Sequence, residues 1–132
     1  MDIEAIASGA MPKALGPYSQ AVRAGDLLFV AGQTGIDPTS GTVPDGGFDA
    51  EARQAFLNLA AVLRAAGSDL NRVVKTTVFL TDAESFGAMN ELYAEFFPTS
   101  PPVRSTPIVA LPKGLLISIE AIAAGGVGSE GG

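Results

Sequence analysis

The sequence predicts an α+β fold in which two amphipathic helices cover one face of a single mixed β-sheet. Strand-like and helix-like segments follow one another in the order β-β-β-α-β-α-β-β. Each helical segment has its apolar residues on one side only, which favours packing against one face of a sheet. The chain has 132 residues, enough for one domain with a substantial core, and we expect that domain to span residues 1–124.

The N-terminal third of the chain supplies the first strands. Ile3 to Ala7 is a short strand candidate, and Met11 to Pro17 is a loop, because two prolines and a glycine there break either regular period. Residues 18–24 and 27–33 have strand character and are joined by a hairpin turn at Ala24-Gly25-Asp26. The second of these strands is apolar on both faces, so we expect it to be central.

The first helix is predicted between residues 49 and 66, after a surface loop at 34–48 that is rich in Gly, Pro and Asp. Gly67 supplies its C-terminal stop. The second helix is predicted from an N-cap at Thr81 or Asp82 to about Phe97. Their apolar stripes are Ala52, Phe56, Leu59, Leu63 and Ala66 for the first helix, and Phe86, Met89, Tyr93, Phe96 and Phe97 for the second.

Three more strands are predicted at residues 72–80, 103–109 and 116–124, the first of them rich in Val, Thr and Phe. The Gly-rich tail, residues 125–132, is predicted to be flexible.

The sheet face without helices is expected to pack against a second chain. The chain is 47% hydrophobic and only 17% charged, more apolar surface than one small domain buries. We expect apolar residues on that second face, among them Val74, Val78 and Ile119.

The composition excludes several kinds of chemistry. The chain has no Cys and no His, which excludes disulfides, thiolate nucleophiles, Ser-His-Asp triads and the usual zinc sites. Its net charge is −6 and its basic residues are scattered, so we expect no nucleic-acid binding, which depends on clustered Lys and Arg. The opening Met-Asp-Ile-Glu lacks the features of a secretory signal and no apolar run is long enough for a membrane span, so a cytoplasmic location is expected.

Arg104 is the first candidate site residue. It lies in an apolar, proline-rich stretch in which an unpaired buried guanidinium costs several kcal/mol. It therefore either pairs with an acid of this or a neighbouring chain, or binds an anion from outside. Its planar fork matches a carboxylate in bidentate fashion, and Ser105 and Thr106 beside it add short donors.

Glu120 is the second candidate. It lies mid-strand and shares a strand face with Ser118 and Ile122. It either pairs with Arg104 or makes a hydrogen bond at a subunit contact, or its carboxylate holds, or takes a proton from, an attacking water.

Three further residues are weaker candidates. The Tyr18 hydroxyl follows a rigid turn and either packs locally or bonds a substrate. Gly32, after Ala31, lets a ligand approach backbone amides closely. Lys75 could supply the cation of a site, but a lysine on an alternating strand is expected to face solvent.

These segments resemble, in this order, the RidA (YjgF) family of small enamine/imine deaminases. The resemblance covers about residues 3 to 124. The matching pieces are Pro12-Lys13-Ala14-Leu15-Gly16-Pro17-Tyr18-Ser19-Gln20-Ala21, Gly32-Gln33, Val74-Lys75-Thr76-Thr77-Val78-Phe79, Pro102-Val103-Arg104-Ser105-Thr106 and Ile119-Glu120-Ala121-Ile122-Ala123.

The resemblance implies a chorismate-mutase-like α+β fold that trimerises through the helix-free face, with three clefts between subunits. It implies hydrolysis of 2-imino acids such as 2-iminobutanoate and 2-iminopropanoate, or their enamines, to 2-keto acids and ammonia. This reaction pre-empts metabolite damage and uses no metal or organic cofactor.

The resemblance also assigns roles to the candidate residues. Arg104 would bind the substrate carboxylate and Glu120 would position or activate water. Tyr18 would line the cleft from the other subunit, and the backbones near Ala31-Gly32 and Thr106 would contact the substrate.

The chain departs from the family pattern at Ala31, where many deaminating members carry Ser, and at Thr34-Gly35, where Ile-Pro or Leu-Pro is common. The first departure keeps open a second hypothesis, a non-catalytic trimer that binds small keto or imino acids. A third hypothesis, endoribonuclease or translation-inhibitor activity, is disfavoured by the acidic balance.

Overall fold

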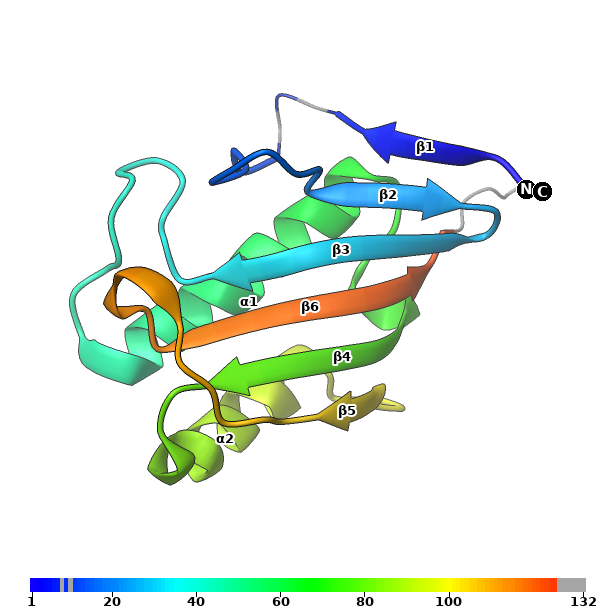
Figure 1. Ribbon diagram of the computed structural model, residues 1–132. Coiled ribbons are helices and arrows are strands. Elements are labelled where there is room, and N and C mark those ends of the chain that lie inside the picture. The colour runs from blue at the N-terminus through cyan, green and yellow to red at the C-terminus, as the bar shows by residue number, and fades with distance from the viewer. Residues whose placement is uncertain (8, 10, 126–132) are drawn as a thin grey trace.

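Six strands form one mixed sheet in the order β1-β2-β3-β6-β4-β5, and both helices lie on the same side of it (Figure 1). The computed structural model describes residues 1–7, 9 and 11–125. The strands are β1 (Ile3–Ile6), β2 (Ala21–Ala24), β3 (Leu27–Thr34), β4 (Val73–Leu80), β5 (Val103–Ser105) and β6 (Ile117–Ala124), and the helices are α1 (Gly47–Ala65) and α2 (Phe86–Phe96). The predicted α+β class with two helices on one face is confirmed.

The handedness of the chain connections explains why both helices share one face. β3 and β4 are each antiparallel to β6, which lies between them, so β3 and β4 run in the same direction. β5 is parallel to β4. The chain thus steps twice in the same direction across the sheet, through α1 and then through α2. Because such parallel crossovers are almost always right-handed, both helices must lie on the same face.

The core lies between the helices and the sheet. Phe56, Leu59 and Leu63 of the predicted stripe on α1 are fully buried. Val78 and Ile119 are also fully buried beneath the helices, so their predicted place on the helix-free face is wrong. The register pairs them with each other, on the opposite side from Glu120.

The helix-free face nevertheless carries apolar side chains. On β3, Leu28 and Val30 are buried beneath the helices, so the alternation turns Leu27 and Phe29 to the other side. Leu27 and Phe29 are 40% and 41% exposed, respectively. Ile122 of β6 lies opposite Phe29 and extends the same surface.

Two predicted element boundaries shift. Asp82 caps a short 3-10 turn by accepting a hydrogen bond from the Glu84 N–H at 2.9 Å, and α2 begins only at Phe86. β5 is three residues long instead of the predicted seven-residue strand 103–109. Pro107 lacks an N–H and so cannot donate to a strand ladder, which accounts for the early end of β5.

A buried acid joins α1 to the segment before β6. Glu51 is 4% exposed, and its Oε2 accepts a hydrogen bond from the Leu116 N–H at 2.7 Å. Gly35 passes so close to Glu51 that a Cβ there would clash with the helix backbone. This close approach explains a glycine after Thr34.

The end of β6 is fixed to the rest of the fold. The Arg23 guanidinium donates to the Ala66 carbonyl at 2.8 Å and to the Gly125 carbonyl at 2.9 Å. The Gly125 N–H donates to the Asp26 carbonyl. Residues 126–132, which make up the rest of the predicted tail, lie outside the described residues. None of the helices that the structure describes is both long and apolar enough to cross a membrane.

Replacing Gly67 with alanine should destabilise the fold. Gly67 has φ +86° and ends α1, where its N–H donates to the Arg64 carbonyl and the Ser68 N–H donates to the Leu63 carbonyl. An alanine in this left-handed conformation should lower the free energy of unfolding by about 1 kcal/mol.

The matched control is Gly87→Ala in α2, where an added Cβ meets open space. Because helical alanine is favoured over glycine, this control should raise stability by about 0.5 kcal/mol. Urea denaturation followed by circular dichroism measures both changes, and equal effects of the two variants would contradict the assignment.

Candidate functional site

Glu120 lies in a hollow on the helix-free face of the sheet. Its side chain is exposed and projects from the middle of β6, on the face predicted from the sequence. The hollow has a volume of about 260 Å³. Its lining includes Ser19, Phe29, Ala31, Lys75, Thr77, Glu120 and Ile122. The hollow therefore combines one carboxylate, one ammonium group and an apolar wall.

Lys75 and Glu120 are the charged groups that line this hollow. Thr77 lies directly opposite Glu120, so Lys75, two residues along the same strand face, is its diagonal neighbour. The Lys75 ammonium donates to Thr77 Oγ1 at 3.3 Å. Lys75 is exposed, as predicted, and at the same time belongs to the Glu120 hollow.

A β-bulge places Ala31 and Gly32 opposite Glu120. The pairing of β3 with β6 shifts between Val30 and Gln33, so two residues face one. The Ala31 N–H donates to the Gln20 carbonyl at 2.9 Å, which means that this amide is already bonded within the chain. A Cβ on Gly32 would lie 2.5 Å from Ser118 Oγ, so glycine keeps the two strands close at this point.

Tyr18 lines a second hollow of about 240 Å³, together with Gly32 and Lys13. Tyr18 is 47% exposed, and its hydroxyl accepts a hydrogen bond from the Leu15 N–H at 3.1 Å. The phenol therefore braces its own turn. A ligand that took this hydroxyl as an acceptor would compete with the Leu15 amide.

Two buried glutamines hold the loop that carries Tyr18 against β3. The Gln33 Nε2 donates to Gln20 Oε1 at 2.8 Å and to the Ala31 carbonyl at 3.0 Å. The Gln20 Nε2 in turn donates to the Pro12 carbonyl at 2.9 Å. Sequence reasoning missed this pair, although polar residues at inward strand positions are a signal that could have found it.

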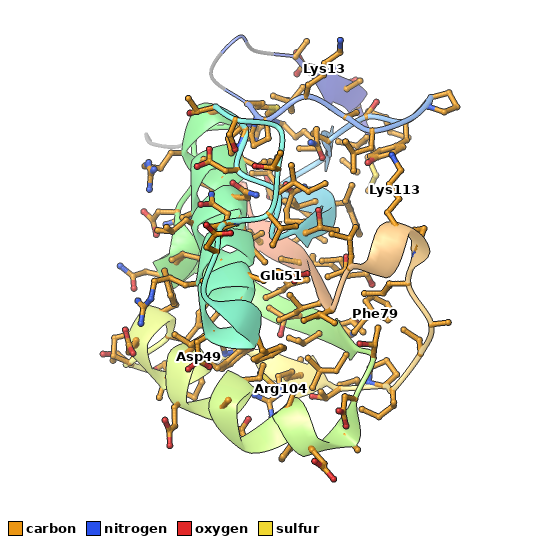
Figure 2. The ribbon with its side chains drawn as sticks, turned by 90° about the vertical axis from the view of Figure 1, so that its left-hand side faces the viewer. Lys13, Asp49, Glu51, Phe79, Arg104 and Lys113 are labelled. Carbon is orange, nitrogen blue, oxygen red and sulfur yellow. The ribbon has the colours of Figure 1, made fainter. Side chains whose placement is uncertain are left out.

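Arg104 lies on the other side of the sheet, beneath α2. It pairs across the strands with Thr76, whose side chain is buried under the helices. Its Cζ lies 4.6 Å from the Tyr93 ring centroid and 5.5 Å from that of Phe86. Its Nη1 lies 3.7 Å from Met89 Sδ. Figure 2 shows Arg104 next to α2, at the opposite end of the molecule from Lys13.

The Arg104 guanidinium has no carboxylate partner among the residues that the structure describes. It is held instead by two aromatic faces and a thioether, none of which neutralises its charge. The side chain is only partly buried, so its remaining N–H groups can reach an external anion. Pairing with an acid of the same chain is thus absent from the described part of the chain, whereas pairing with a neighbouring chain and binding of an external anion both stay predictions.

One chain does not bring Arg104 and Glu120 together. Arg104 lies opposite Thr76 and Glu120 lies opposite Thr77. Because successive residues of a strand point to opposite faces, the two charged side chains lie on opposite sides of the sheet. Thr106 follows Arg104 just beyond β5 and is partly buried.

Comparison with known proteins shows which family shares this architecture. A family model described as Endoribonuclease L-PSP matches residues 8–125. The crystal structure of RidA from an Antarctic Psychrobacter superposes with a TM-score of 0.86 at 40% identity, covering 92% of this chain and 98% of that one. The chain belongs to the RidA (YjgF) family. The resemblance seen in the sequence is thereby confirmed.

Two other members of the RidA family bear on function. The mouse 2-iminobutanoate/2-iminopropanoate deaminase is 49% identical over 116 residues, which are 87% of this chain and 86% of the mouse protein. The Escherichia coli TdcF structure, which holds a bound serine, has a TM-score of 0.85 at 36% identity and covers 92% of this chain and 98% of that one.

Replacing Gln33 with leucine should loosen the loop that carries Tyr18. The variant leaves the buried Gln20 Oε1 without its donor, which should cost about 1–3 kcal/mol of stability. Trypsin should then cut faster after Lys13 under native conditions.

Ser68→Ala is the control, because it removes a hydrogen bond at the other end of the fold, from Ser68 Oγ to the Ala124 carbonyl. It should leave cleavage after Lys13 unchanged. Equal acceleration in both variants would mean that the glutamine pair does not hold this loop.

Proposed function

We propose that this RidA-family chain hydrolyses 2-imino acids, such as 2-iminobutanoate and 2-iminopropanoate, to 2-keto acids and ammonia. The observation that carries the proposal is the Arg104 guanidinium, held by aromatic faces with no carboxylate partner among the described residues. Such a fork is suited to a small carboxylate. The mouse relative named as a deaminase for these two substrates supports the assignment.

The reaction needs few protein groups. A protonated imine is already electrophilic at C2, so water adds there while the C=N π pair moves to nitrogen. Arg104 binds the substrate carboxylate, and Glu120 orients the water and accepts its proton. Glu120 then returns the water's proton to the nitrogen of the resulting carbinolamine, and ammonia leaves as the C2 hydroxyl gives its proton to the Glu120 carboxylate and becomes the keto C=O.

A complete site takes groups from two protomers. Arg104 and Glu120 lie on opposite faces of one sheet, so a single substrate meets both only where two chains adjoin. The apolar side chains of Leu27 and Phe29 on the helix-free face support association through that face. We therefore assign a homotrimer whose clefts pair the β5 edge of one protomer with the Glu120 hollow of the next.

Four other residues shape the cleft in this proposal. Tyr18 and Gly32 line one side, from the second hollow. Ala31 contributes its methyl group, since its N–H is bonded to Gln20. Thr106, two residues after Arg104, offers a hydroxyl and backbone groups to the bound acid. In this assignment, residues 1–124 act as one catalytic domain.

A second candidate function is a non-catalytic trimer that binds keto or imino acids. Ala31 favours it, because the Glu120 hollow lacks the hydroxyl that many deaminating relatives have at this position. Binding of 2-ketobutyrate without any acceleration of imine loss would select this function. The ribonuclease activity in the description of the family model is disfavoured by the net charge of −6.

Replacing Arg104 with alanine should reduce kcat/KM for 2-iminobutanoate about 100-fold or more, because the carboxylate loses its charged partner. An amino-acid oxidase generates the imine in the assay and semicarbazide traps it, so an active enzyme slows semicarbazone formation. Arg53→Ala is the matched control, because Arg53 is exposed and pairs with Glu95. Undiminished turnover in the Arg104 variant, with the control also unchanged, would refute the role of the fork.

Mixing two inactive variants should restore activity if the site spans two protomers. The Arg104→Ala and Glu120→Gln variants are mixed in equal amounts, denatured together and refolded. Each site then takes its arginine and its glutamate from two independently chosen chains, so about a quarter of the sites should have both wild-type groups. The same variants refolded separately are the controls. A mixture no more active than its parts would show that both groups act within one chain.

A further inference from the structure

Three side chains of α2 meet the Arg104 guanidinium. Phe86, Met89 and Tyr93 follow one another at the three- and four-residue spacing of one helix face. Phe86 is 45% exposed, whereas Met89 and Tyr93 are buried. The Tyr93 ring is also the nearer aromatic surface, 4.6 Å from Arg104 Cζ against 5.5 Å for Phe86. Tyr93 therefore gives the guanidinium its closest and best-buried aromatic support.

The Tyr93 ring is itself fixed on several sides. Its hydroxyl lies 2.6 Å from Thr76 Oγ1, and both residues are buried. Phe56 meets the ring edge-on at 5.9 Å between centroids, and Phe97 lies 4.7 Å away. A ring held by a short hydrogen bond and two aromatic neighbours presents a face of constant direction.

These contacts join three elements of the fold. Thr76 on β4 is the cross-strand partner of Arg104 on β5, and Tyr93 on α2 contacts both residues. The hydrogen bond between Thr76 and Tyr93 thus fixes the ring relative to the strand pair that carries the arginine. Since β5 is a three-residue edge strand, this support from the helix compensates for a short backbone ladder.

The phenol is also kept neutral. Burial raises the pKa of Tyr93 above its ordinary value, against opposing effects from the Thr76 hydrogen bond and the Arg104 charge. A phenolate at this position would pair with the guanidinium and compete with an incoming carboxylate. The neutral ring supports the arginine and leaves its fork free.

We propose that Tyr93 is a positioning residue, which, bonded to Thr76, fixes the plane and direction of the Arg104 guanidinium for carboxylate binding. This inference rests on the proposed function, because it gives Arg104 the role of carboxylate ligand. An arginine side chain has about 2 kcal/mol of rotamer entropy, part of which is lost before binding if the fork is held in place. Tyr93 and Thr76 therefore act on affinity and leave the chemical step unchanged.

The test removes each hydroxyl of the pair conservatively, with Tyr93→Phe and Thr76→Val, and combines the two changes. Each single variant should weaken binding of 2-ketobutyrate, measured by isothermal titration calorimetry, about 3- to 10-fold. KM for 2-iminobutanoate should rise by the same factor while kcat stays near that of the wild type. The double variant should be no worse than either single one, because both remove the same bond.

Two controls make the outcome decisive. Ser68→Ala removes a part-buried hydrogen bond to the Ala124 carbonyl, which involves neither Arg104 nor its contacts, and should lower Tm without changing the Kd for 2-ketobutyrate. An equal loss of affinity in Ser68→Ala would attribute the effect to general destabilisation and overturn the inference. Unchanged affinity in both hydroxyl variants, while Arg104→Ala loses binding, would overturn the inference and leave the proposed function intact. Normal binding by Arg104→Ala would overturn both.

Discussion

The right-handed sense of two chain crossovers is the constraint from which the rest of this structure follows. β3, β4 and β5 run in one direction, and α1 and α2 join them in sequence, so the helices share one face of the sheet. One face then holds the buried core, and the other is left with exposed Leu27 and Phe29. This division also separates the two charged candidate residues, because strand alternation places Arg104 on one side and Glu120 on the other.

The environment of Arg104 shows how a guanidinium can be held without being neutralised. A carboxylate partner would stabilise the charge and also occupy the fork, whereas an aromatic face attracts the cation and leaves its N–H groups available. Tyr93 serves this purpose as a neutral phenol, and burial raises the pKa of its hydroxyl, against the opposing effects of the Thr76 hydrogen bond and the Arg104 charge. The same packing that completes the core between α2 and the sheet therefore also holds the Arg104 guanidinium.

Local patterns in the sequence predicted the two helices, the central strand and the face of Glu120, because apolar periodicity and strand alternation are short-range properties. Candidate site residues could also be chosen, since a lone Arg104 in an apolar stretch and a mid-strand Glu120 are unusual. The sequence could not show that Arg104 and Glu120 lie on opposite faces of the sheet, because this depends on the register between β4, β5 and β6. Val78 and Ile119 were predicted on the wrong face because alternation separates the two faces of a strand without showing which face the helices cover.

The short edge strand β5 has a consequence for assembly. An exposed edge offers unpaired backbone groups to any passing strand, and Val103, 67% exposed, would favour such adhesion. Pro101 and Pro102 precede the strand and Pro107 follows it, so a foreign strand finds no continuous row of donors there. Polymerisation by edge addition is thereby discouraged, and the border of the sheet that carries Arg104 stays accessible for contacts made through side chains.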